Sequence, residues 1–84
     1  MRDIDHIIYK LQDEMEEYSV CLIALEWYGK DKEAVHVSYP GFDFVEYWTK
    51  RQIIARGKIE LLVYVLHDEL TLECEKKLKE WGVI

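Results

Sequence analysis

The sequence predicts an α+β fold in which helices pack around a small three-stranded mixed sheet. Residues 20–25 are an unbroken apolar run, apolar on both faces, which is typical of a central strand covered on both sides. Residues 34–39 alternate between apolar and polar side chains, which is typical of a half-buried strand at a sheet edge. Residues 59–66 are rich in β-branched and aromatic side chains and follow a glycine, which favours a third strand.

Two helices are predicted at the ends of the chain from apolar residues at helical spacing. Residues 3–17 form an amphipathic helix with Asp3 as its N-cap. The last helix begins within residues 68–72 and ends at Trp81, with Gly82 in the position that a Schellman ending requires.

A further helix is predicted to begin at Asp43. Asp43 and Glu46 have the spacing of a capping box, and Phe42 and Tyr47 have the spacing of a hydrophobic staple. Gly57 is the expected C-terminal stop of this helix.

The elements therefore follow the order α-β-β-α-β-α. A right-handed crossover from the second strand to the third gives the sheet order 2-1-3, with residues 20–25 in the centre. One alternative stays open, α-β-β-α-α with residues 59–66 helical. A glycine inside a helix costs only about 1 kcal/mol, and four residues around Gly57 also share one helical face: Ala55, Ile59, Leu62 and Leu66.

Composition indicates one cytoplasmic domain that spans residues 1–84. Half of the residues are apolar, enough for a packed core, and no run is long enough to cross a bilayer or to act as a signal peptide. The net charge of −6 opposes binding to nucleic acid or anionic membrane by the chain as a whole. Cys21 and Cys74 are expected to be buried thiols. A charged fraction of 33% and the absence of Asn resemble the composition of thermophile proteins.

No catalytic residue, metal site or cofactor is predicted. The three histidines lack a partner at metal-ligand spacing, and residues 67–69 are adjacent, so their side chains diverge. A nuclease-like set drawn from Glu26, Asp43 and Lys50 has no motif to support it. An enzyme is therefore not expected.

The basic side chains are concentrated in residues 50–58, which hold Lys50, Arg51, Arg56 and Lys58 and no acid. Basic residues close to aromatic ones can bind phosphates and stack on bases. Nucleic-acid binding by this segment is therefore the alternative function. The simpler interpretation is the solvated side of a helix, paired with acids elsewhere in the chain.

The predicted function is a small non-enzymatic protein–protein interaction module, an inhibitor or accessory protein that acts as a homodimer. Aromatic residues crowd the middle of the chain, more than so small a domain can bury completely. The expected anchors are Trp27, Tyr39, Tyr47 and Trp48, and the expected charged rim is Lys50, Arg51 and Arg56.

Overall fold

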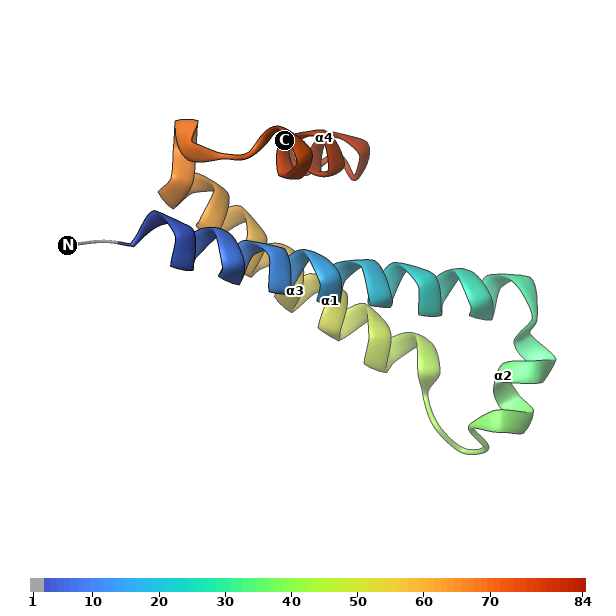
Figure 1. The fold of residues 1–84 in the computed structure, drawn as a ribbon. Coiled ribbons are helices and arrows are strands. Elements are labelled where there is room, and N and C mark those ends of the chain that lie inside the picture. Colours follow the sequence, from blue (N-terminus) through green and yellow to red (C-terminus); the bar gives the residue numbers. More distant parts are fainter. Residues whose placement is uncertain (1–2) are drawn as a thin grey trace.

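In the computed structural model, which describes residues 3–84, every regular element of the described chain is helical. Figure 1 shows two long helices side by side in opposite directions, with a short helix at the end where the chain turns back and the last helix lying over the first. The elements are α1 (Ile4–Lys30), α2 (Lys32–Ser38), α3 (Phe44–Leu66), the 3-10 turn η1 (His67–Glu69) and α4 (Leu72–Glu80).

The predicted α+β fold is wrong, and its central strand, residues 20–25, lies within α1. In this helix Cys21 is completely buried, whereas Val20 and Ile23 are 43% and 64% exposed. The run is apolar on all sides because α1 carries apolar side chains on its solvent side as well as on its packed side. A strand covered on both faces produces the same pattern.

The predicted edge strand, residues 34–39, is also wrong, because most of this segment forms α2. The Asp31 carboxylate caps this helix by accepting a hydrogen bond from the Ala34 amide at 3.0 Å. Val35 is buried and Val37 is 80% exposed. A strand would have placed these two valines on one face, so the observed burial follows the helical period.

The third predicted strand, residues 59–66, continues α3 through Gly57, as the alternative for this segment proposed. Gly57 is therefore an interior residue of a helix and not its C-cap. Ile59 is completely buried and Leu61 is 64% exposed, although a strand would place both on one face. With no strand between residues 3 and 84, the sheet order 2-1-3 does not apply.

The capping residues Asp3, Asp43 and Gly82 were predicted correctly, whereas the predicted helix ends at residue 17 and Gly57 lie inside α1 and α3. Asp3 accepts a hydrogen bond from the His6 amide at 3.4 Å, and Asp43 accepts one from the Glu46 amide at 3.1 Å. At the end of α4, Gly82 has φ +72° and the Val83 amide donates to the Leu78 carbonyl at 2.9 Å, which is the long hydrogen bond of a Schellman ending.

The core lies along the contact between α1 and α3 and extends under α4. Cys21 and Cys74 are both buried free thiols, as predicted. Burial, with a smaller effect from nearby Glu17, raises the pKa of the Cys21 thiol above its ordinary value. The main cluster of buried residues is Leu11, Met15, Tyr18, Ala55, Ile59, Leu66, Cys74 and Leu78.

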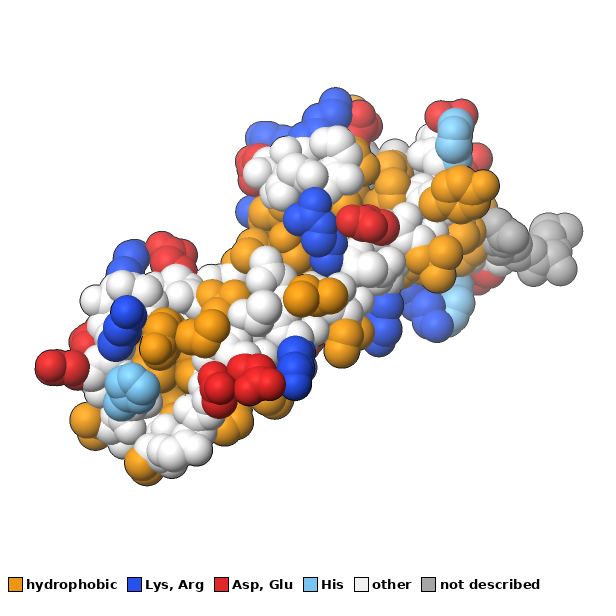
Figure 2. Space-filling model, turned by 180° about the vertical axis from the view of Figure 1, so that it is seen from behind, with side chains coloured by type: hydrophobic (Ala, Val, Ile, Leu, Met, Phe, Trp, Pro, Cys, Tyr) orange, Lys and Arg blue, Asp and Glu red, His pale blue; other side chains and the backbone are white. Residues whose placement is uncertain are grey.

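The molecule is elongated and exposes more surface than a compact domain of its mass. Its radius of gyration is 15.2 Å, whereas about 12 Å is expected for a compact domain of this length. It exposes 6186 Å², whereas a compact monomer of 10.1 kDa exposes about 5,300 Å². Figure 2 shows hydrophobic side chains reaching the surface at several points along the hairpin, between charged ones.

Two alanine substitutions distinguish the helix from the predicted strand. Ile59→Ala should lower the free energy of unfolding by about 2–5 kcal/mol because it empties a buried site. Leu61→Ala should change it by less than about 0.5 kcal/mol because Leu61 is exposed. Urea unfolding at low protein concentration measures both, and equal losses would contradict the helix.

Candidate functional site

Aromatic side chains from α1, from α3 and from the loop between α2 and α3 meet at the end of the hairpin where the chain turns back. Phe44 lies at their centre and is 5% exposed. Its ring centroid is 5.8 Å from that of Trp27, 5.6 Å from that of Tyr39 and 6.1 Å from that of Trp48. These are normal distances for favourable ring contacts. This cluster, called the aromatic end below, consists of Trp27, Tyr28, Tyr39, Phe42, Phe44, Tyr47 and Trp48.

The outer rings of the aromatic end remain accessible. Trp27 is 38% exposed, Tyr39 46%, Phe42 42% and Tyr47 41%. A shallow groove runs between Tyr39, Phe42, Tyr47 and Trp48. The cluster therefore has a packed centre and a half-exposed rim of large, rigid side chains.

The loop between α2 and α3 folds back and brings its aromatic residues together. The Phe42 amide donates to the Tyr39 carbonyl at 3.2 Å, and Gly41 between them has φ +74°, a conformation that glycine adopts easily. Asp43 then caps α3. The rings of Phe42 and Tyr47 lie 5.2 Å apart, so the predicted staple contact is present.

Arg51 borders the aromatic end and is held from three sides. It donates a hydrogen bond to the Tyr47 hydroxyl at 2.7 Å, pairs with Glu17 of α1 and lies 5.1 Å from the Trp48 ring centroid. The hydrogen bond to Tyr47, followed by the contact with Glu17, raises the pKa of Arg51. Lys50 pairs with Glu46 at 2.8 Å.

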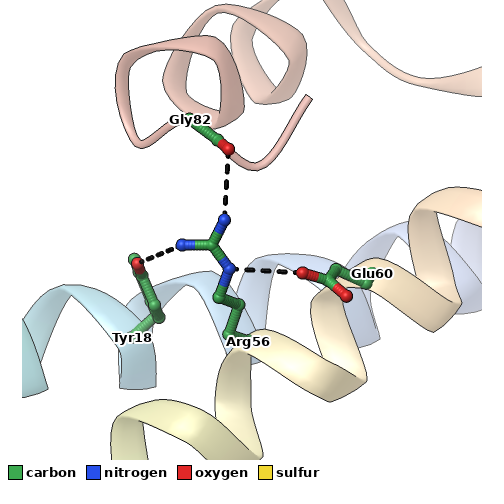
Figure 3. A network of polar contacts seen from close by, with 4 residues as sticks. All are labelled: Tyr18, Arg56, Glu60 and Gly82. Carbon is green, nitrogen blue, oxygen red and sulfur yellow. Dashed lines mark hydrogen bonds and ion pairs between the residues drawn. The ribbon is translucent and has the colours of Figure 1, made fainter.

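The structure does not bring Arg56 together with the other predicted site residues. Figure 3 shows its guanidinium between α1, α3 and the C-terminal end of α4. It donates to the Gly82 carbonyl at 3.1 Å, to the Tyr18 hydroxyl at 3.3 Å and to Glu60 at 3.2 Å. Arg56 therefore joins α4 to the hairpin.

The segment 50–58 does not present a free basic surface. Lys58 lies 3.7 Å from Glu14 of α1, and the other three cations also have acidic partners. This arrangement matches the simpler interpretation of the segment, a solvated helix side paired with acids.

The three residues of the nuclease-like set each have another partner. Glu26 pairs with Lys30 at 3.0 Å, Asp43 caps α3 and Lys50 pairs with Glu46. Across residues 3–84, no group of three or more His, Cys, Asp or Glu side chains is placed to hold a metal ion.

Comparison with protein-family models, with curated proteins and with solved structures finds no match to this chain. Among the described helices, none is both long and apolar enough to span a membrane.

Sequence reasoning listed the four predicted anchors but missed the residue that unites them. Phe44 is not among the predicted anchors, yet its ring contacts those of Trp27, Tyr39 and Trp48 at once. Its position directly after the Asp43 cap, four residues before Trp48, was the available signal.

Arg56→Ala should loosen α4. Cys74 of α4 is 4% exposed, so it should react faster with a thiol reagent once the contact with Gly82 is lost. Cys21 is an internal control because the charged groups near it, Glu17 and Arg51, lie on α1 and α3 and not on α4, so its labelling rate should not change. Lys58→Ala, which removes a cation without touching α4, should leave Cys74 protected. Mass spectrometry of alkylated peptides measures these rates, and equal protection of Cys74 in all forms would contradict the role of Arg56.

Proposed function

We propose that this chain is a non-enzymatic protein–protein interaction module that acts as a homodimer and holds a partner protein at the aromatic end. The observation that carries the proposal is the set of large aromatic side chains, each 38–46% exposed, around the buried ring of Phe44. An inhibitor or accessory protein of an enzyme would act in this way.

The chemistry of the aromatic end suits a protein partner. Tryptophan and tyrosine are common among the residues that contribute most to binding, because they bury a large area and lose little side-chain freedom. Here ring contacts already fix Trp27 and Tyr39 against each other, with centroids 6.3 Å apart. Because these two side chains are already held in place, they lose little further conformational freedom when a partner binds.

Lys50 and Glu46 form an exposed ion pair beside the rings. Such a pair contributes little affinity, but it favours a partner with complementary charges.

Nucleic-acid binding by residues 50–58 gains no support from this geometry. All four cations of the segment have acidic partners, and binding a phosphate would require breaking these pairs. It remains as one outcome of the test below.

The test is capture of partners from a lysate of the source organism, with and without nuclease, by the tagged full chain. The double variant Tyr39→Ser and Tyr47→Ser removes two exposed rings and should reduce recovery of a discrete protein by at least about tenfold. Tyr9→Ser is the matched control because Tyr9 is 68% exposed on α1 outside the aromatic end, and it should capture as the unmodified chain does.

Circular dichroism of each variant checks that it remains folded. Equal recovery by all forms would refute the aromatic end as the binding surface. Recovery of nucleic acid alone, lost at moderate salt, would favour the alternative function.

A further inference from the structure

The outward side of α3 carries a second apolar stripe that residues 3–84 leave exposed. Ile54 is 59% exposed, Leu61 64% and Tyr64 79%, and Gly57 between them is exposed as well. These four positions follow one another by three, four and three residues, which is the spacing of the apolar seam between two packed helices. They are called the α3 stripe below.

Gly57 has no function in the packing of its own chain. A Cβ atom added at Gly57 would have nothing within 4 Å, and the residue does not have a positive φ. Glycine inside a helix costs about 1 kcal/mol relative to alanine. Its absent side chain does, however, leave room on the exposed face for the backbone of another helix to approach closely.

The basic residues of the segment 50–58, which includes part of the α3 stripe, all have acidic partners within the chain. The four cations of residues 50–58 are paired with four acids, two of them on α1 and two on α3. The chain as a whole has a net charge of −6, so two copies repel each other at most orientations. Two copies that met at the α3 stripe would keep these ion pairs within each copy.

The elongated molecule as a whole exposes more surface than a compact monomer, by an amount comparable to the area that one standard interface buries on each partner. The exposed area of 6186 Å² exceeds that of a compact monomer by about 900 Å². A stable interface of standard size buries about 800 Å² on each partner.

We propose that a second copy of this chain packs its α3 against this α3, so that the two helices cross at Gly57 about a twofold axis. Ile54, Leu61 and Tyr64 of each copy then lie on either side of the crossing point, and the two hairpins form a four-helix arrangement. The inference rests on the homodimer in the proposed function and assigns it a surface. It leaves the aromatic end free for the partner protein.

Sedimentation equilibrium of the full chain and two matched variants tests this assignment. Leu61 and Ile23 are both 64% exposed, but only Leu61 belongs to the α3 stripe. Leu61→Lys should weaken dimerisation by about 100-fold or more because it buries an unpaired charge. Ile23→Lys should leave the dimer intact. A monomeric unmodified chain at all concentrations, or a dimer broken by Ile23→Lys and not by Leu61→Lys, would overturn the proposal.

A third variant separates the contact at Gly57 from the folding of the chain. Gly57→Gln should stabilise the helix of the isolated chain, since glutamine is the better helix former. It should nevertheless weaken the dimer by about 10- to 100-fold, because the added side chain keeps the helices apart. Dimerisation as tight as that of the unmodified chain would refute the crossing at Gly57.

Failure of this proposal and failure of the proposed function are separable. If the aromatic end binds the partner protein, Leu61→Lys should still capture it, whereas the Tyr39→Ser and Tyr47→Ser double variant should still dimerise.

Discussion

The antiparallel contact between α1 and α3 is the constraint on which the rest of the structure depends. Leu11 and Ile59 are completely buried in it, and Ala55 supplies a small side chain where the helices come close. Two ion pairs, Arg51 with Glu17 and Lys58 with Glu14, join the same helices, and α4 packs on the hairpin through Cys74 and Leu78. Because two helices share only one mutual face, this contact cannot bury all the apolar side chains of such long helices.

Both proposed surfaces consist of apolar side chains that the contact between α1 and α3 does not bury. At the end where the chain turns back, the helices separate, and aromatic rings from α1, α3 and the loop after α2 meet there, with the outer rings half-exposed. Along α3, no described element covers the side that faces away from α1, and the α3 stripe remains at the surface. One surface is suited to anchoring a different protein through rigid rings, and the other is suited to a second copy of the same helix.

The sequence was informative where a single residue determines local geometry and misleading where the pattern depends on what surrounds it. Asp3, Asp43 and Gly82 marked helix ends correctly, because capping is a local interaction. Residues 20–25 and 59–66 looked like strands because a helix with apolar side chains on its solvent side loses its amphipathic pattern. The anchors at Trp27, Tyr39, Tyr47 and Trp48 do meet at one end, but the separate position of Arg56 depends on where α4 packs, which periodicity does not specify.

The most direct test of this account is the set of backbone ¹³Cα chemical shifts of residues 20–25 and 57–66 in solution. Continuous helices α1 and α3 predict helical shifts throughout both segments, including Gly57, with slow amide exchange at the buried Cys21 and Ile59. Extended-strand shifts in either segment, with contacts between the two backbones, would contradict the helical hairpin and both surfaces derived from it.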